Sequence, residues 1–281
     1  MSDIRIFAFA DEASADFDGQ IRAMKRNGLN GLEIRNVSNK NAIDLPLEDV
    51  KELRKKMDDA GLVTWSMGSP IGKIHIEKDD FAAHLEKYKR TLEAANILGA
   101  KSVRLFSFFM PAEKDPAVFR NEVIDRLGQF ADIAQGSDIA LCHENEKGIY
   151  GDNAVRCLDL LKAEPRLDGV FDPANFVQCG QNTLEAWEML GDRIKYMHIK
   201  DALADGSVVP AGKGEGNVQA IVRAYIARGG KEFTMEPHLK VFAGLAALEQ
   251  EGERSAVGEK YVYDSNDAAF DAACDAFKAL L

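Results

Sequence analysis

The amino-acid sequence predicts a single-domain (β/α)₈ barrel over residues 1–281. Strand-like and helix-like runs alternate along the chain, which is typical of parallel α/β folds. Eight strand-like runs can be counted, and no proline-rich or serine-rich linker divides them. A doubly wound open sheet is the main alternative. The count of eight favours closure into a barrel, and no GxGxxG follows the first strand, so the usual nucleotide-binding fingerprint is missing.

The predicted strands are short runs rich in apolar and β-branched residues, as expected for strands of a buried parallel sheet. They cover residues 4–9, 31–34, 63–67, 102–106, 139–143, 169–171, 194–199 and 232–235. The segments between them have helical periodicity, and in the first of these Phe17, Ile21 and Met24 share one stripe. Helices are predicted over residues 17–24, 47–57, 81–98, 116–134, 153–163, 183–190 and 218–228, with a last helix, 268–280, packing across the barrel.

Composition and charge limit the classes of function. The formal net charge of −11 and the pI near 5.0 argue against nucleic acid as a main partner, because phosphate binding needs a basic surface. The four cysteines form no CxxC and fit neither a zinc finger nor a disulfide framework, so we expect a reducing compartment. The N-terminus enters a strand directly, which leaves no room for a signal peptide, and no apolar run reaches transmembrane length. We therefore expect a cytoplasmic protein without a membrane partner.

Four runs in the second half of the chain each end in a metal-binding side chain. They are IALCHE ending at Glu144, GVFD at Asp172, YMH at His198 and FTME at Glu236, separated by about 28, 26 and 38 residues. These separations match one strand, one helix and two loops of a βα repeat. Because parallel strands end at one face of the sheet, three carboxylates and one imidazole should meet there. Such a ligand set suits Mn²⁺, Mg²⁺, Co²⁺ or Zn²⁺.

Each of these residues alone has a simpler interpretation. Glu144 would also suit a helix cap or a surface loop, and Asp172 precedes Pro173 as a turn-opening aspartate does. A lone strand histidine such as His198 is more often a hydrogen-bonded core residue than a ligand, and a loop salt bridge would explain Glu236. The recurrence of one such residue per strand at this spacing favours the metal site.

The motifs HENEKG, FDPANF, HIKD and MEPH, in this order, resemble the xylose isomerase-like TIM barrels, also called AP endonuclease family 2. That family includes sugar-phosphate isomerases and epimerases, ketose 3-epimerases and inosose dehydratase. The resemblance implies one divalent metal ion, with Mn²⁺ as the first choice, held by Glu144, Asp172, His198 and Glu236. A DNA-repair branch with three zinc ions needs several more histidines than the five in this chain, so nucleic acid is not an expected partner.

The resemblance also implies the chemistry. Proton transfer next to the carbonyl of a keto-sugar or sugar phosphate passes through an enediolate, which a divalent ion stabilises. In the ketose 3-epimerases of the family, the two metal-bound glutamates exchange protons with the sugar from opposite faces, so Glu144 and Glu236 become the predicted acid/base pair. The predicted function is that of an isomerase or epimerase. The alternatives are a lyase or dehydratase, of the inosose type or acting on a 3-keto-glycoside, and a non-catalytic sugar-binding barrel.

Further positions are predicted to contact a small-molecule sugar substrate. Asn175 stands three residues after Asp172, where the epimerases have a substrate-binding histidine. Glu33 ends the second predicted strand, and Lys200 follows the seventh. Glu146 lies just beyond the fifth and completes the set of predicted substrate residues.

Three loops and one arginine carry the remaining predictions. Residues 68–75 contain two glycines and are predicted to fold over the site as a lid. The glycine-rich residues 210–216 lack the Walker spacing and are predicted to be a connecting loop, with a phosphate site of backbone N–H groups as the alternative. An ordinary surface loop is the alternative for residues 68–75. Arg104 is predicted to form a buried ion pair or to contact an anion, and residues 242–263 are the predicted contact of a homo-oligomer.

Overall fold

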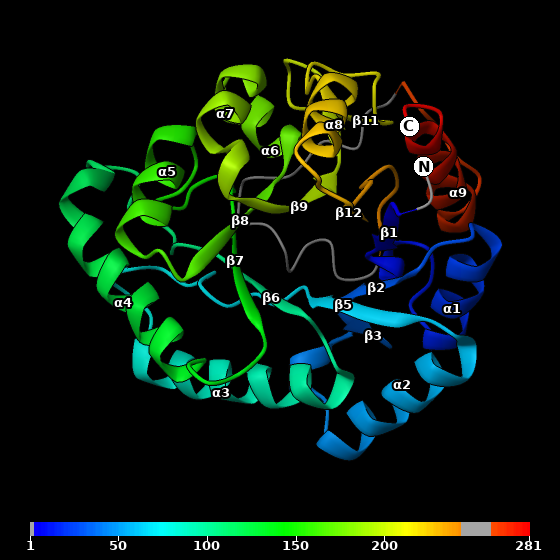
Figure 1. Ribbon diagram of the computed structural model, residues 1–281, viewed down its shortest axis with the longest axis horizontal. Coiled ribbons are helices and arrows are strands. Elements are labelled where there is room, and N and C mark those ends of the chain that lie inside the picture. The colour runs from blue at the N-terminus through cyan, green and yellow to red at the C-terminus, as the bar shows by residue number, and fades with distance from the viewer. Residues whose placement is uncertain (1–2, 243–259) are drawn as a thin grey trace.

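The computed structural model describes residues 3–242 and 260–281, which form a closed barrel of eight parallel strands ringed by helices (Figure 1). In chain order the strands are β1 (Arg5–Ala8), β2 (Gly31–Ile34), β5 (Val63–Met67), β6 (Ser102–Leu105), β7 (Ala140–Glu144), β8 (Leu167–Phe171), β9 (Ile194–Ile199) and β12 (Glu232–Met235). Each pairs with the next, and β12 pairs with β1 to close the sheet. The predicted (β/α)₈ barrel is confirmed. Most of the predicted oligomer contact, 243–259, lies outside the described residues.

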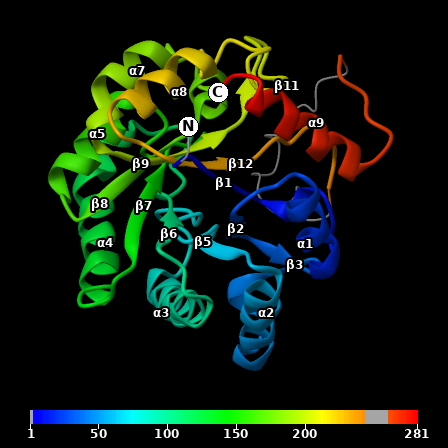
Figure 2. The same ribbon diagram turned by 45° about the vertical axis from the view of Figure 1, so that its right-hand side comes forward.

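Helices cover the outside of the sheet between successive barrel strands (Figure 1, Figure 2). Gly61 and Gly99 end the second and third of them in the left-handed conformation, which glycine adopts without strain. Within the described ranges, no helix is both long and apolar enough to cross a membrane. The outer helices are α1 (Phe17–Arg26), α2 (Leu47–Ala60), α3 (Phe81–Leu98), α4 (Arg120–Ile133), α5 (Ala154–Ala163), α7 (Thr183–Leu190), α8 (Val218–Ala227) and α9 (Asn266–Lys278).

The last helix does not pack across the barrel as predicted, but takes the eighth place in the outer ring. Figure 2 shows α9 beside α1. Arg26 of α1 pairs with Asp267 and Asp271 of α9 at 2.5 and 2.8 Å. On the inner side of the helix, the ring of Phe277 lies 5.2 Å from that of Phe233 in β12. The outer face of β12 needs an apolar cover like that of every other barrel strand, and α9 provides it.

Several short elements lie outside the sequence prediction. They are the helix α6 (Pro173–Gln178) and two antiparallel pairs, β3 (Asn36–Val37) with β4 (Lys40–Asn41) and β10 (Asp201–Ala202) with β11 (Val208–Val209). The helix begins directly after Asp172, where the sequence offered a turn as the simpler interpretation. Asp172 is its N-cap and Pro173 its first residue, where the fixed φ of proline favours a helix start. All of these elements follow barrel strands at their carboxyl ends.

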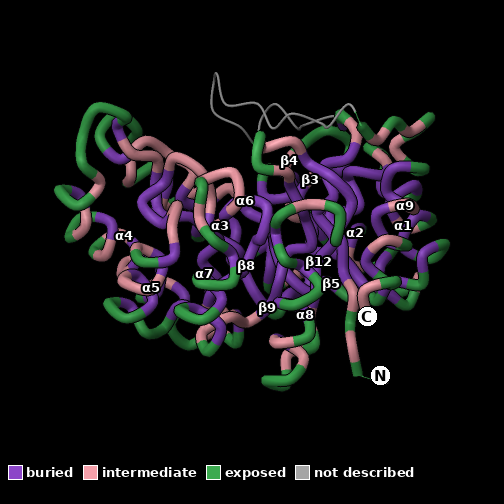
Figure 3. The backbone as a smooth tube through the Cα atoms, turned by 90° about the horizontal axis from the view of Figure 1, so that it is seen from above, coloured by how far each residue is buried: buried purple, intermediate pink, exposed green. Residues whose placement is uncertain are grey.

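An apolar layer fills the inside of the barrel, and the site lies above this layer, at the carboxyl ends of the strands. It consists of Phe7, Trp65, Cys142, Val170 and Tyr196, and the rings of Phe7 and Trp65 stack 5.2 Å apart. Figure 3 shows the buried strands at the centre and the exposed segments outside. Successive side chains of a strand alternate between its two faces. The residues two positions after Cys142, Val170 and Tyr196 therefore also point inwards, one layer higher: Glu144, Asp172 and His198.

The loop of residues 68–75 runs along β6 and is fixed there by hydrogen bonds. Gly72 donates its N–H to His84 Nε2 at 2.8 Å and accepts the N–H of Phe108 at 3.0 Å. Phe106 donates its N–H to the carbonyl oxygen of Ile71 at 2.8 Å. Burial lowers the pKa of His84 to about 4, so its imidazole stays neutral and accepts the bond from Gly72. The predicted lid over the site is not supported.

Gly72→Ala is expected to destabilise the fold more than Gly28→Ala. Both glycines have a positive φ, of 87° and 59°, which costs alanine about 1 kcal/mol. A Cβ on Gly72 would also lie 2.0 Å from the carbonyl oxygen of Phe106, whereas one on Gly28 would meet nothing within 4 Å. Urea denaturation should therefore show that Gly72→Ala loses about 2 kcal/mol more of the free energy of unfolding than Gly28→Ala does. Equal unfolding free energies for the two variants would contradict this packing of the loop.

Candidate metal centre

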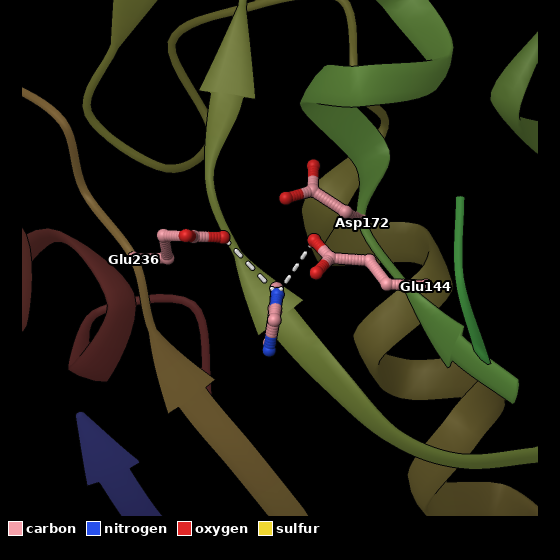
Figure 4. A group of neighbouring side chains, drawn as sticks. Glu144, Asp172 and Glu236 are labelled. Carbon is pink, nitrogen blue, oxygen red and sulfur yellow. Dashed lines mark hydrogen bonds and ion pairs between the residues drawn. The ribbon is translucent and has the colours of Figure 1, made fainter. Parts of the chain in front are cut away.

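The four predicted ligands meet at the carboxyl ends of neighbouring strands. Each contributes one ligand atom to a group whose atoms all lie within 4.8 Å of one another. The residues are at most 4% exposed. Figure 4 shows Glu144 and Glu236 reaching the centre from opposite sides, with Asp172 beside Glu144. In the order β7, β8, β9 and β12, the candidate ligands are Glu144, which ends its strand, Asp172, which follows its strand, His198, the last residue but one of its strand, and Glu236, which follows its strand.

The imidazole of His198 lies between carboxylates on both of its nitrogens. Nδ1 is 2.9 Å from Glu144 Oε1 and 3.1 Å from Glu236 Oε2. Nε2 is 3.1 Å from Glu33 Oε2. Burial opposes the charged form, but Glu144, Glu33 and Glu236 outweigh burial and raise the pKa of the imidazole well above its usual value. In the absence of a metal ion, His198 therefore carries the proton that a metal would displace.

Glu33 is fully buried, and both of its oxygens are engaged. His198 occupies one oxygen, and the hydroxyl of Tyr196 donates to the other at 2.9 Å. Burial would raise the pKa of Glu33, but His198 and Arg104 lower it overall, so the carboxylate stays ionised. A carboxylate on the far nitrogen of a ligating histidine fixes the tautomer and orientation of the ring. These contacts favour an orienting role for Glu33, while its predicted contact with a substrate stays a prediction.

Asp172 is both a helix cap and a member of the site. Its Oδ1 accepts the N–H of Asn175 at 2.9 Å, while Oδ2 lies 3.0 Å from Lys200 Nζ. Asn145, which has no signal in the sequence, donates to the backbone carbonyl of Asp172 and accepts its N–H, both at 3.0 Å. Burial raises the pKa of Asp172 to about 7, although Lys200 opposes the shift. The turn-opening and ligand interpretations of this aspartate are therefore compatible.

The donor atoms of the centre fit a divalent cation. Among the described residues, Glu144 Oε2, Asp172 Oδ2 and Glu236 Oε2 are buried and accept no hydrogen bond of good geometry. Their ion-pair partners Arg104, Lys200 and His198 lie 3.0–3.1 Å away. A metal ion would be a further partner for these buried oxygens. Three carboxylates and one imidazole form the oxygen-rich set that suits Mg²⁺ and Mn²⁺ and that Zn²⁺ also accepts.

Two buried cations border the centre. Arg104 Nη1 is 3.1 Å from Glu144 Oε2 and 3.8 Å from Glu236 Oε1. Lys200 Nζ, already close to Asp172, is also 3.6 Å from Glu236 Oε2. Burial disfavours both charges, but the neighbouring carboxylates outweigh it and raise the pKa values of Arg104 and Lys200. Arg104 therefore forms a buried ion pair, one of its two predicted roles.

A further ionic network, missing from the sequence prediction, holds Glu236 from the other side. Arg35 is fully buried and binds Asp11 at 2.9 and 3.0 Å, Glu12 at 3.3 Å and Glu236 at 3.0 Å. Burial raises the pKa of Glu12 to about 8, although Arg35 opposes the shift. Asp11 and Glu12 come soon after β1, and Arg35 directly follows β2. The strand-end rule that selects Glu144 also points to Arg35, but not to Asp11 and Glu12, which lie in a short 3-10 helix after β1.

Glu12, Glu236 and His238 form a second buried group whose donor atoms lie within 4.8 Å of one another. His238 Nε2 is 3.4 Å from Glu12 Oε1 and 3.5 Å from Glu236 Oε1. The guanidinium of Arg35 contacts both glutamates of this group. The group shares Glu236 with the group around His198, which offers one more ligand. The larger donor set makes the group around His198 the candidate metal centre.

Two other predicted substrate residues lie at this end of the barrel. Asn175 Nδ2 is 3.4 Å from Glu144 Oε1, and Glu146 Oε2 pairs with Lys73 Nζ at 2.9 Å. Burial would raise the pKa of Glu146, but Lys73 and Lys200 lower it overall. The predicted contacts of Asn175, Glu146 and Lys200 with a substrate stay predictions.

The glycine-rich loop of residues 210–216 binds a carboxylate of its own chain. The N–H groups of Gly212 and Gly214 donate to Asp201 Oδ2, and that of Gly216 donates to Oδ1, each at 2.9 Å. A Cβ on Gly214 would lie 2.4 Å from Oδ1, so the close approach requires glycine. The alternative of a phosphate site is wrong, because Asp201 occupies the N–H groups of the loop.

Binding of Mn²⁺ is expected to displace the proton of His198. Affinity should rise by about tenfold per pH unit near neutrality, because a protonated imidazole cannot be a ligand. Calorimetric titrations in two buffers of different ionisation heat should report about one proton released per ion. The Glu33→Gln variant lacks one carboxylate that raises the pKa of His198. Its Mn²⁺ affinity should therefore rise over a lower pH range than that of the wild type. An affinity that is constant between about pH 6 and about pH 8 would contradict this assignment.

Comparison with known proteins places this geometry in a family. A family model described as xylose isomerase-like TIM barrel matches residues 21–239. No curated protein matches the sequence. Among solved structures, L-ribulose 3-epimerase shares 19% identity with a TM-score of 0.74, over 100% of this chain and 94% of that one.

Two further solved structures have the same fold. The probable 3-DHS dehydratase AsbF from Bacillus anthracis shares 16% identity with a TM-score of 0.73, over 98% of each chain. The IOLI protein, described with a binding zinc atom, shares 17% identity with a TM-score of 0.72, over 99% of this chain and 97% of that one. Identities this low establish a common fold and leave the activity open. The family match covers most of the barrel, and the chain belongs to the xylose isomerase-like TIM barrel family.

Proposed function

We propose that this chain is a divalent-metal-dependent isomerase or epimerase that moves a proton next to the carbonyl of a keto-sugar or sugar derivative. The observation that carries the proposal is the placement of Glu144 and Glu236 on opposite sides of one buried centre (Figure 4). Two carboxylates so placed can remove a proton from one face of a carbon and return one to the other face. The fold shared with L-ribulose 3-epimerase supports a sugar substrate.

The proposal includes one metal ion per chain, with Mn²⁺ first and Mg²⁺, Co²⁺ or Zn²⁺ as alternatives. When bound, the ion would supply electrostatic stabilisation of negative charge on the oxygen atoms beside the reacting carbon. The zinc atom of the IOLI structure supports a metal in this fold. The residues that would hold the ion are Glu144, Asp172, His198 and Glu236.

Buried cations lie beside both glutamates. Burial alone would raise the pKa of Glu236, but Lys200 and His198 outweigh it and hold the pKa well below its usual range. Glu236 is therefore ionised when no metal ion is bound. On the other face, Arg104 lies 3.1 Å from Glu144 Oε2 and brings positive charge to that carboxylate.

Other side chains at this end would bind and orient the sugar. Asn175, Lys200 and Glu146 border the centre and offer an amide, an ammonium and a carboxylate. Glu33 would act through His198 by fixing the orientation of its ring. Below the site, the apolar layer that contains Trp65 closes the barrel against water from the opposite end.

A dehydratase is the second candidate, and Lys200 is the observation that favours it. Elimination of water needs an acid for the departing hydroxyl group in addition to a base. Lys200 is a buried ammonium within 3.6 Å of Glu236, the proposed base. The fold shared with the probable dehydratase from Bacillus anthracis supports this second candidate.

The alternatives differ in their products. A dehydratase, or a lyase acting on a 3-keto-glycoside, would form an enone that absorbs ultraviolet light. A non-catalytic sugar-binding barrel would turn over no sugar.

A cytoplasmic location is part of the same proposal. Cys142, Cys157 and Cys274 are buried thiols that form no disulfide in the structure, which suits a reducing compartment.

Solvent deuterium is expected to enter the carbon next to the carbonyl of the substrate without loss of water. Glu144→Gln and Glu236→Gln should each lower the epimerisation rate by about 10²–10⁴-fold, the usual contribution of a general acid or base. Each variant should still exchange deuterium with one of the two epimers, because the remaining glutamate serves its own face. Nuclear magnetic resonance of both epimers in D₂O measures this pattern.

Metal content measured on the same samples provides the control, since glutamine keeps one oxygen ligand. If Glu236→Gln held a full complement of metal and turned over the substrate at the wild-type rate, Glu236 would not be an acid/base group of the reaction. Loss of water together with a new ultraviolet absorption would replace the epimerase proposal with the dehydratase.

A further inference from the structure

We infer that the amino-terminal end of the barrel, opposite the metal centre, binds the phosphate group of a small molecule. A hollow of about 580 Å³ lies there, and its wall includes the first residues of three barrel strands, Arg5, Ile194 and Glu232. A smaller hollow of about 280 Å³ shares Arg5 and Trp65 with it. The apolar layer that contains Trp65 separates both hollows from the metal centre, so the inference is independent of the proposed reaction.

The charge of this end has the opposite sign to that of the whole chain. The formal net charge of the protein is −11, yet the walls of the two hollows contain six cationic side chains and four carboxylates. A local excess of cations attracts anions from solution. The carboxylates are Asp58, Asp168, Asp192 and Glu232, and the cations are Arg5, Arg54, Lys101, Arg193, Lys195 and Arg228.

Arg193 in the wall of the larger hollow is fixed by groups that carry no net charge. Its Nη1 donates to the carbonyl oxygen of Leu161 at 2.6 Å. Its Nη2 donates to the carbonyl oxygens of Leu167 at 2.6 Å and of Pro165 at 3.3 Å. In the described part of the chain, its hydrogen-bond partners are these carbonyl oxygens, and none is a carboxylate. The guanidinium is therefore held in place with a positive charge that an anionic ligand can use.

Arg228 is positioned at the same hollow by its neighbours. Its guanidinium lies 5.1 Å from the centroid of the Trp187 ring. A Cβ on Gly191 would lie 1.9 Å from Nη1, so the glycine leaves the space that the guanidinium occupies. Arg228 pairs with Asp192 at 3.2 Å, with side chains 42% and 91% exposed. Exposed ion pairs contribute little to stability, so Arg228 can turn from Asp192 to a ligand.

The wall that the two hollows share combines a third arginine with an unsatisfied donor. The guanidinium of Arg5, which also pairs with Glu232, lies 5.4 Å from the centroid of the Trp65 ring. Trp65 is 5% exposed, and among the described residues its Nε1 has no hydrogen-bond partner. Buried N–H groups without an acceptor are uncommon.

The donors around the larger hollow suit phosphate better than other ligands. Arg5, Arg193 and Arg228 all line it, and guanidinium groups bind phosphate and carboxylate through pairs of hydrogen bonds. Three arginines offer more donors than the two oxygens of one carboxylate can use. A phosphate group has enough oxygens to accept from several guanidinium groups and from an indole N–H.

Titration of the Mn²⁺-loaded protein with inorganic phosphate and with glycerol 3-phosphate tests the inference, and glycerol is the uncharged match of the ester. The chain has two tryptophans. Trp65 lines the larger hollow and Trp187 contacts Arg228 in its wall, so binding should change the intrinsic fluorescence. The change should saturate with a Kd of about 1 mM or below and weaken at higher ionic strength. Glycerol should cause no change.

Arg193→Gln and Arg228→Gln should each raise the Kd for phosphate by about fivefold or more, because each loses a charge-assisted hydrogen bond. Arg193 also binds carbonyl oxygens of its own chain, so circular dichroism has to verify the fold of that variant. Arg228 is partly exposed, and its replacement should leave the fold intact. Arg22→Gln removes the same charge from an exposed position of α1 outside both hollows and should keep the wild-type Kd.

The same titration without Mn²⁺ separates this site from the metal centre, and the Kd should not change. Tighter binding of glycerol 3-phosphate would support the inference with a phosphate ester as the ligand, and equal binding would support it with free phosphate. No saturable binding below about 10 mM would overturn the inference. A wild-type Kd in Arg228→Gln, an equal loss in Arg22→Gln, or binding that requires Mn²⁺ would overturn it as well.

Discussion

The compensation of charge around His198 is the constraint on which the rest of the site depends. Its two nitrogens face three carboxylates, from Glu33, Glu144 and Glu236, and the whole group is buried. Carboxylates this close repel one another unless a positive charge lies among them. When no metal is bound, a protonated imidazole, which the raised pKa of His198 favours, would provide that charge. A divalent ion would replace the proton and convert His198 into a neutral ligand, so the same groups suit both states.

The interior of the barrel strengthens the electrostatic attraction between the charges around His198. The layer of Phe7, Trp65 and Tyr196 below the site excludes water, and electrostatic interactions are stronger in such surroundings. The ligands are fixed by contacts beyond the centre. Asn145 holds the backbone of Asp172, and Arg35 holds Glu236. The proposed chemistry thus depends on side chains that need not touch the substrate.

The barrel and the meeting of the four candidate ligands could be predicted because both follow from patterns along the chain. A buried parallel strand is a continuous apolar run, and a carboxylate or imidazole at its end is visible in the sequence. The missed features depend on contacts between distant residues. Only the folded chain shows that Asp201 fills the glycine-rich loop, or that α9 has to cover Phe233. The network of Arg35 combines the ends of three strands, and no local pattern reports such a combination.

Metal content tests the central claim most directly. After loading with Mn²⁺ and desalting, mass spectrometry should find about one ion per chain in the wild type and little in His198→Ala. His143→Ala is the matched control, because this strand histidine is also buried but binds Ser107 Oγ at 2.9 Å, away from the ligands. With folding verified by circular dichroism, it should keep the ion. No metal in the wild type, or equal metal in all three proteins, would contradict the account.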